Sequence, residues 1–197
     1  MDNNVLIIFI KNPVLGKVKT RLANAIGEEK ALIIYAELLD ITRNQVLDLP
    51  FKKYLFYSEF IDGNDHWPED IFTKEVQSGA DLGKRMCNAF RHVLSNASKA
   101  VIIGSDCPEL SSQVIEKAFF LLDSNDVVIG PSSDGGYYLL GMKALHIDLF
   151  SGISWSSSEV LSSSITKLEM AALSYSLLEV LDDIDQVEDL EKWRKGG

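Results

Sequence analysis

Short apolar runs alternate with longer segments of helical spacing along this chain, and this alternation constrains the fold more than any other feature. The first run, NVLIIFI at residues 4–10, is rich in β-branched residues, as is typical of a strand buried on both faces. Further runs predict strands at residues 53–58, 126–131, 137–142 and 173–180, and at the start of 99–110. The segments between them predict helices at residues 28–49, 81–96, 111–124, 156–171 and 185–195.

Strands that alternate with helices predict an α/β fold, a three-layer sandwich with a mainly parallel sheet. The runs at 126–131 and 137–142 are joined by SSDGG, which predicts a local hairpin and therefore one antiparallel strand. With 197 residues, the chain is long enough for a sizeable core, and we expect a single domain over residues 1–197.

Charge, cysteine content and the length of the apolar runs indicate which partners and which compartment to expect. The formal net charge of −10 disfavours nucleic acid or an anionic membrane as a bulk partner. Cys87 and Cys107 lack metal-type spacing, so we expect a reducing compartment. The longest apolar run near the start has six residues, too few for a signal peptide or a membrane span. We therefore expect a cytoplasmic protein.

The stretch FIKNPVLGKVKTRLA at residues 9–23 gathers positive charge in this acidic chain. It carries Lys11, Lys17, Lys19 and Arg21 and no acidic residue, and it follows the first predicted strand. Ligands of open α/β sheets bind at the carboxyl ends of the strands. A solvated start of a helix is the alternative explanation, but cations destabilise a helix N-terminus. We therefore favour a phosphate-binding loop, which matches neither a P-loop nor a dinucleotide fingerprint.

Aspartates follow two other predicted strands. Asp106, in GSDCPEL, can hold a hard divalent cation, or it can be a turn residue that caps the next helix. Asp183 and Asp185, in LDDIDQVEDL, belong to an acidic cluster whose repulsion a cation would relieve. Asp185 and Glu188 can also cap the closing helix. The sequence leaves both interpretations open for each motif.

Two further motifs have a simple structural explanation beside a functional one. Asp134, Gly135 and Gly136 form a good hairpin turn, which is compatible with a substrate-binding role for the same loop. Ser156 and Glu159 have the spacing of a capping box, so we expect Glu159 to be structural.

The segment QSGADLGKRM joins an edge element to the helix at 81–96. Gly79 and Gly83 would allow the backbone to approach a ligand closely. Asp81 is explained most simply as the N-cap of that helix.

Six motifs in order resemble one protein family over nearly the whole chain. They are FIKNPVLGKVKTRLA, GADLGKRM, GSDCPEL, GPSSDGGYYLLG, ISWSSSEVL and DDIDQVEDL. Together they resemble a bacterial family of glycosyltransferase-A-like (GT-A) proteins related to the 2-phospho-L-lactate guanylyltransferases. The chain is more distantly similar to molybdenum cofactor guanylyltransferases and sugar nucleotidyltransferases. The resemblance implies a nucleotide-diphospho-sugar transferase fold with the nucleotide lying over the strand ends.

The resemblance also implies roles for particular residues. Catalytic roles fall to Lys19, Arg21 and Asp106, and nucleotide or phosphate contacts to Lys11, Lys17, Lys19, Arg21, Gly79, Asp81 and Gly83. A substrate loop would contain Asp134, Gly135, Gly136 and Trp155. Mg²⁺ or Mn²⁺ would be held by Asp106 with Asp185 or Asp183, and we favour Asp185. The family pattern D-x-D-T-P-E-D-L reads DIDQVEDL here, with Gln186 and Val187 in place of Thr and Pro.

Two chemistries follow from this resemblance. The protein would bind a nucleotide-sugar or a nucleoside triphosphate and transfer a glycosyl or nucleotidyl group to a small acceptor. The basic loop favours nucleotidyl transfer, because departing pyrophosphate needs cations. The family's usual description favours glycosyl transfer, although SDC at Asp106 keeps only one acid of the D-x-D motif. A non-catalytic nucleotide-binding module is the third alternative.

Overall fold

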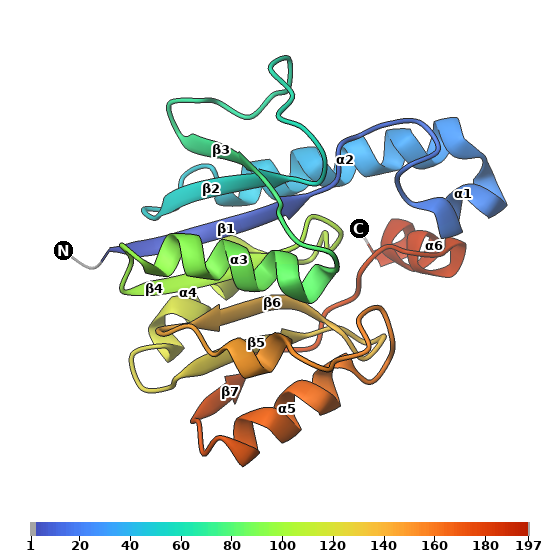
Figure 1. Ribbon diagram of the computed structural model, residues 1–197. Coiled ribbons are helices and arrows are strands. Elements are labelled where there is room, and N and C mark those ends of the chain that lie inside the picture. The colour runs from blue at the N-terminus through green and yellow to red at the C-terminus, as the bar shows by residue number, and fades with distance from the viewer. Residues whose placement is uncertain (1–2, 197) are drawn as a thin grey trace.

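A seven-stranded sheet forms the centre of the molecule (Figure 1). The computed structural model describes residues 3–196. In chain order the strands are β1 (Asn4–Ile10), β2 (Lys52–Tyr57), β3 (Phe72–Val76), β4 (Lys99–Ile103), β5 (Val127–Pro131), β6 (Tyr137–Met142) and β7 (Tyr175–Leu177). The order across the sheet is β3-β2-β1-β4-β6-β5-β7. Strand β6 runs antiparallel to β4 and β5, and the other pairs are parallel, which confirms the predicted mainly parallel sheet with one antiparallel strand.

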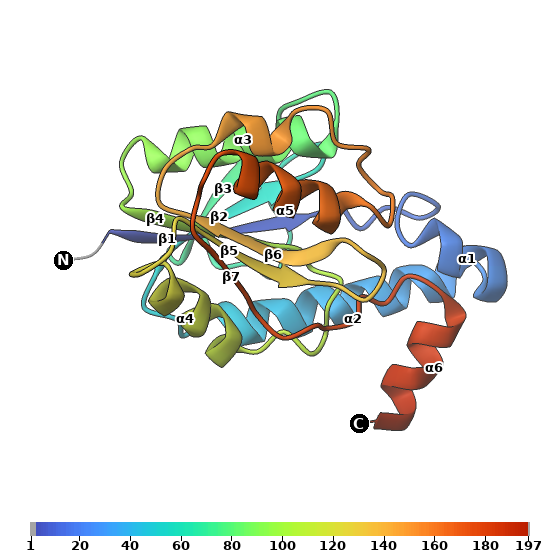
Figure 2. The ribbon, with the colours of Figure 1, turned by 90° about the horizontal axis from the view of Figure 1, so that it is seen from below.

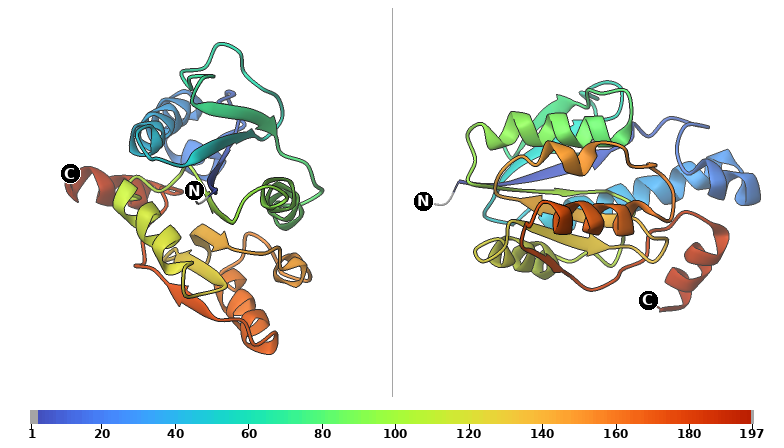
Figure 3. Two further views of the ribbon diagram at one scale, coloured as in Figure 1. Left: turned by 90° about the vertical axis from the view of Figure 1, so that its left-hand side faces the viewer. Right: turned by 60° about the horizontal axis from the view of Figure 1, so that its bottom comes forward.

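Helices cover both faces of the sheet, which confirms the predicted three-layer sandwich (Figure 2). The helices are α1 (Thr20–Ile26), α2 (Glu28–Val46), α3 (Leu82–Leu94), α4 (Ser112–Leu121), the 3-10 helix η1 (Ile147–Phe150), α5 (Val160–Met170) and α6 (Val187–Gly196). Helices α2 and α4 pack on one face, and α3, η1 and α5 pack on the other. Helix α6 lies outside these layers, near α1 (Figures 2 and 3). None of the helices in residues 3–196 is long and apolar enough to cross a membrane.

The alternation of side chains along β1 explains why its sequence is apolar throughout. Leu6 and Ile8 enter the core shared with α2 and α4, whereas Val5 and Ile7 enter the core shared with α3 and α5. All four are at most 3% exposed. Each such buried side chain contributes about 1.5–3 kcal/mol to stability. A strand with a core on both faces therefore needs apolar residues at every position.

Three predictions about local structure need correction. Residues 20–26 form helix α1 and are not loop. Helix α5 begins at Val160 rather than at 156, and the predicted capping box is wrong, because Glu159 is the N-cap residue and no side chain caps the helix. Ser156 instead adopts a left-handed conformation with φ of 66°. The strand expected at 173–180 is limited to the three residues of β7.

The connections that bear the predicted motifs leave the sheet at one edge. The loop of residues 11–19 follows β1, and Asp106 follows β4, which is parallel to β1. The β5–β6 turn and the segment after β7 emerge at the same edge, because β5 and β7 are parallel to each other and β6 returns antiparallel. Figure 1 shows α1 and α6 at this edge, at the carboxyl end of β1.

Candidate active site

A cleft of about 420 Å³ opens at the carboxyl ends of β1 and β4. Its lining contains seven of the predicted site residues: Lys11, Lys19, Arg21, Asp106, Asp134, Asp183 and Asp185. The other predicted site residues do not line it: Lys17, Gly79, Asp81, Gly83, Gly135, Gly136 and Trp155. The structure thus brings together three of the four predicted cations and four of the five predicted carboxylates, and it leaves Lys17, Asp81, Trp155 and the predicted glycines outside the lining.

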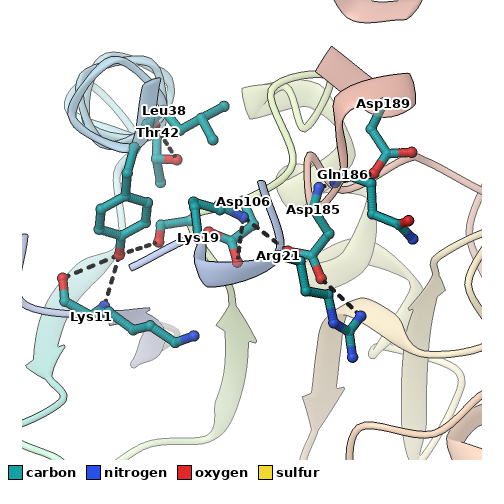
Figure 4. A network of polar contacts seen from close by, with 11 residues as sticks. Lys11, Lys19, Arg21, Leu38, Thr42, Asp106, Asp185, Gln186 and Asp189 are labelled. Carbon is teal, nitrogen blue, oxygen red and sulfur yellow. Dashed lines mark hydrogen bonds and ion pairs between the residues drawn. The ribbon is translucent and has the colours of Figure 1, made fainter. Parts of the chain in front are cut away.

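Lys19 is the central charged residue of the cleft (Figure 4). Its Nζ lies 3.1 Å from Asp106 Oδ2 and 3.2 Å from Asp185 Oδ1, and its side chain is only 3% exposed. The residue is the N-cap of α1 and adopts a left-handed backbone with φ of 47°. That conformation costs a non-glycine residue roughly 1–2 kcal/mol. The two ion pairs therefore hold Lys19 in a strained position that directs its ammonium group into the acidic cluster.

Asp185 pairs with a second cation and does not cap the closing helix. Its Oδ2 lies 3.6 Å from Nη1 of Arg21, whose side chain is 63% exposed. The amides of Asp185 and Gln186 instead donate to Oδ2 of Asp189, at 3.0 and 2.8 Å. Asp189 thus performs the capping that the sequence assigned to Asp185 and Glu188. This arrangement leaves the carboxylate of Asp185 directed at the cations of the basic loop (Figure 4).

Asp183 is the carboxylate with the least compensation. Its pKa is raised to about 7, mainly by burial and next by the charge of the nearby Asp106, while Lys19 opposes the shift. Asp134 and Asp185 add smaller shifts in the raising direction. Within residues 3–196, Asp183 forms no ion pair. The ionised form of Asp183 would therefore be stabilised by an additional cation in the cleft.

The donors of the cleft fit a divalent metal ion. In the described part of the chain, no group of three or more His, Cys, Asp or Glu side chains is arranged so that it could hold a metal ion. Mg²⁺, however, is usually bound by one or two carboxylates together with substrate phosphates. Carboxylate oxygens are the donors that Mg²⁺ and Mn²⁺ prefer. Such a cation would stabilise the ionised form of Asp183, which burial and Asp106 disfavour.

Buried polar residues that the sequence did not indicate hold the basic loop in place. The hydroxyl of Tyr35, on α2, accepts from the amide of Lys11 at 2.8 Å and lies 3.2 Å from Ser105 Oγ. Burial raises the pKa of this hydroxyl, and the hydroxyl is therefore neutral. The backbone amide of Asn12 donates to Ser58 Oγ at 3.0 Å. Tyr35 thus links the loops after β1 and β4, although its helical spacing marks it only as a core residue.

The predicted nucleotide-binding segment before α3 has mainly structural contacts. Asp81 is the N-cap of α3, and its Oδ1 accepts from the amide of Lys84 at 2.8 Å, which confirms the capping interpretation. Gly79 has φ of +147°, and an added Cβ would lie 2.7 Å from the amide of Arg85. A Cβ at Gly83 would overlap the ring of Trp155. Gly83 therefore provides the space in which Trp155 packs against α3.

The β5–β6 turn is stabilised by Asp134. Its Oδ1 accepts from Ser132 Oγ at 2.5 Å and from the amide of Gly136 at 2.9 Å. Gly135 has φ of +88°, and its missing side chain allows the carbonyl of Ser158 to approach. Asp134 also lines the cleft. The structural role and a substrate role are therefore compatible for this loop, as the sequence indicated.

The strand order, with a charged cleft at the carboxyl ends of β1 and β4, defines a nucleotide-diphospho-sugar transferase fold. A protein of Desulfovibrio desulfuricans G20, provisionally described as a nucleotide-diphospho-sugar transferase, has this structure with a TM-score of 0.92. It shares 30% sequence identity, and the similarity covers 100% of this chain and 88% of that chain. This chain also matches a family model over residues 20–157. It belongs to that family, DUF2064, which is described as "uncharacterized protein conserved in bacteria". These findings confirm the superfamily predicted from the six motifs.

More distant structures share the fold. The inositol-1-phosphate CTP transferase of T. maritima has a TM-score of 0.59 and 13% identity, over 95% of this chain and 91% of that chain. A manganese complex of Rv0371c from Mycobacterium tuberculosis H37Rv has a TM-score of 0.55 and 12% identity, over 99% of this chain and 100% of that chain. No curated protein matches the chain by sequence.

Proposed function

We propose that this protein is a divalent-metal-dependent nucleotidyltransferase that acts on a small acceptor. The observation that carries this proposal is the convergence of Lys19, Arg21, Asp106, Asp183 and Asp185 at one cleft. Cations that can hold phosphates and carboxylates that can hold a metal lie together at the sheet edge where α/β proteins bind ligands. The transferases among the structures with this fold agree with that class of activity.

Lys19 and Arg21 would bind the phosphate chain. Arg21 is largely exposed and can offer two parallel N–H donors to phosphate oxygens. Lys19 is a buried point charge close to Asp106, so it would stabilise charge on phosphate oxygens near the reacting centre. Lys11 is exposed and lines the same cleft, where it would add to the positive potential.

Asp106 and Asp183 would hold the metal ion. The sequence favoured Asp185 as the second ligand, but Asp185 is already paired with Lys19 and Arg21, whereas Asp183 is half-buried and forms no ion pair among residues 3–196. When bound, Mg²⁺ or Mn²⁺ would neutralise negative charge on the phosphates. The protein's own contribution would be to orient the phosphate chain through Lys19 and Arg21 and to keep the reacting phosphate beside Asp106.

The reaction would transfer the nucleotidyl group. An anionic oxygen of the acceptor attacks the α-phosphorus and forms a new P–O bond. The bond from the α-phosphorus to the bridging oxygen breaks, and pyrophosphate leaves with that electron pair. Lys19 and Arg21 support this chemistry, because their positive charges offset the negative charge that develops on pyrophosphate.

Glycosyl transfer from a nucleotide-sugar is the second candidate. It is supported by the description of the D. desulfuricans protein, which is 30% identical over the full length of this chain. A non-catalytic nucleotide-binding module is the remaining alternative, and it predicts binding without turnover.

Thermal-shift titration with nucleoside triphosphates and nucleotide-sugars, with and without Mg²⁺ or Mn²⁺, would test the binding part of the proposal. CTP is the first choice, because the T. maritima transferase with this fold is named for CTP. A ligand at about a hundred times its dissociation constant adds roughly 2.7 kcal/mol of stability. We expect a metal-dependent shift with a triphosphate, which Asp106→Asn abolishes and Lys17→Met leaves in place. Lys17 is a matched control, because it is exposed and lies outside the cleft lining.

Product analysis would separate the three candidates. Release of pyrophosphate supports nucleotidyl transfer, and release of a nucleoside diphosphate from a nucleotide-sugar supports glycosyl transfer. Metal-dependent binding with neither product would favour the binding module. Absence of any nucleotide-dependent shift would contradict the proposal as a whole.

A further inference from the structure

A second, smaller cavity of about 120 Å³ adjoins the cleft under the first turns of α3. The two spaces share five lining residues: Phe9, Leu82, Gly104, Tyr137 and Tyr138. The remaining lining side chains are aliphatic or methionine and come from α3, β4 and β6. A molecule bound in the cleft could therefore extend one group into this cavity without leaving the reacting centre.

The cavity provides few hydrogen bonds to an occupant. Within the part of the chain that the structure describes, no charged side chain lines it. The hydroxyl of Tyr138 donates to the carbonyl of Glu179 at 3.0 Å, and the amide of Gly104 donates to the carbonyl of Tyr138 at 3.2 Å. The Tyr137 ring packs edge-on against Trp155, and burial raises the pKa of its hydroxyl. A polar group placed here would give up hydrogen bonds to water without replacing them.

The cavity lies next to the proposed metal site. Gly104 lines both spaces and stands two residues before Asp106, the residue to which we assign the metal. An added Cβ at Gly104 would meet no atom within 4 Å, so there is open space at this residue, where the cleft and the cavity adjoin. A nucleobase carries hydrogen-bonding groups around its edge, which this lining does not match. A hydrocarbon group does match it.

We propose that this cavity is a subsite for a compact hydrocarbon group carried by the acceptor, an aromatic ring or a branched alkyl group of up to six carbons. An apolar cavity of about 150 Å³ in another protein stays dry and binds benzene, so a space of this size is adequate for such a group. The acceptor class is then an amphipathic small molecule, with an anionic oxygen at one end and a hydrocarbon group at the other. This assignment of the acceptor rests on the proposed nucleotidyl transfer.

Benzene and pyrimidine would test the subsite without any nucleotide. The two rings have similar size, but pyrimidine carries two nitrogen acceptors. We expect benzene to shift the NMR signals of the Met86 and Ile102 methyl groups in the full-length protein, and pyrimidine to bind at least tenfold more weakly. Gly104→Ala adds a methyl group at the entrance and should weaken benzene binding at least fivefold. Gly63→Ala is the matched control, because an added Cβ there also meets nothing within 4 Å and Gly63 does not line the cavity.

The link to the acceptor is tested with CTP and Mg²⁺ present. Benzene should bind equally well to the protein saturated with CTP and Mg²⁺. With benzyl phosphate as the acceptor, pyrophosphate should be released from CTP with a kcat/KM at least tenfold above that measured with methyl phosphate. Equal binding of pyrimidine and benzene, unchanged methyl signals, or displacement of benzene by CTP would overturn the inference. If benzene binds as expected but no nucleotide binds, the proposed function fails while the apolar subsite stands.

Discussion

Replacement of Lys19 by methionine tests the electrostatic design of the cleft most directly. The change keeps the length of the side chain and removes the ammonium group that lies 3.1 Å from Asp106 and 3.2 Å from Asp185. Losing one partner of a buried ion pair costs about 3–5 kcal/mol, whereas exposed pairs contribute about 0–1 kcal/mol. Lys19 is 3% exposed, but its partners are 36% and 43% exposed, so the site lies between these limits. We expect the free energy of unfolding to fall by about 2 kcal/mol at pH 7.

Urea denaturation of a double-mutant cycle would measure the ion pair itself. Lys19→Met, Asp106→Asn and the double variant together give the coupling energy, and we expect about 1–2 kcal/mol. Lys17→Met is the matched control, because Lys17 lies in the same loop and forms no ion pair among residues 3–196. Additive effects of the two cycle variants, or an equal loss in Lys17→Met, would refute the assignment of Lys19 as the internal counter-ion of the acidic cluster.

The same variant should also change metal binding in a defined direction. Without the ammonium group, Asp106 and Asp185 lose the cation that lies between them and become free to attract another. Mn²⁺ binding followed by electron paramagnetic resonance should therefore be tighter in Lys19→Met than in the wild-type protein, while CTP binding becomes weaker. Weaker binding of both ligands would contradict this reasoning and indicate a disrupted cleft.

Four other substitutions have outcomes that the structure specifies. Asp183→Asn should reduce the pH dependence of stability. In the wild-type protein the folded-state pKa of Asp183, about 7, exceeds the ordinary value of 3.8, so the folded state binds this proton more tightly than the unfolded state does. The wild-type protein should lose up to about 1.4 kcal/mol per pH unit as the pH rises from about 4 to about 7. Urea denaturation at pH 5 and 7.5 should thus show Asp183→Asn gaining stability relative to wild type, and parallel curves would disprove it. Tyr35→Phe removes a buried hydroxyl that links two loops. It should lower the free energy of unfolding by about 1–2 kcal/mol and weaken CTP binding. An unchanged Tm with unchanged affinity for CTP would count against that role. Gly83→Ala should lower the free energy of unfolding by about 1–3 kcal/mol, because the new methyl group overlaps the Trp155 ring. Gly104→Ala should change it by less than about 0.5 kcal/mol. Equal Tm shifts in the two variants would show that the packing argument is wrong.

Most of the sheet was predictable because burial on two faces leaves a direct mark on the sequence, whereas the edge strand β3, with the sequence FTKEV, has no apolar run and was not predicted. Val5 and Ile7 face one core and Leu6 and Ile8 the other, so the strand has no polar position between them. The antiparallel direction of β6 followed from the turn sequence SSDGG, which is a local signal. Features that depend on contacts between distant segments were not predictable. The N-cap residue of helix α1 is Lys19, which has a left-handed backbone and whose ammonium group pairs with Asp185, 166 residues away in the chain.

The candidate site shows the same division between local and distant information. The residue types and their place after strands identified the cations and carboxylates that line the cleft, and Asp106 and Lys19 are two of them. Their mutual ion pairing could not be read from the sequence, because no pattern states which charges face one another. Tyr35 illustrates the limit most clearly, since a tyrosine at helical spacing has the same signature whether its hydroxyl is idle or joins two loops.

The concentration of positive charge in one loop of an acidic protein now has a physical explanation. Lys19 and Arg21 do not form an isolated basic patch, because each lies against carboxylates that follow β4 or β7. The cleft therefore contains both signs of charge, and burial and Asp106 disfavour the ionised form of Asp183 until a cation arrives. A complex of a divalent cation with a polyphosphate carries the same two signs, so each internal ion pair could be exchanged for one with the ligand. A free metal ion would meet the repulsion of Lys19, and a free polyphosphate would meet that of Asp183. The arrangement thus favours a ligand that brings both charges together over one that brings either alone.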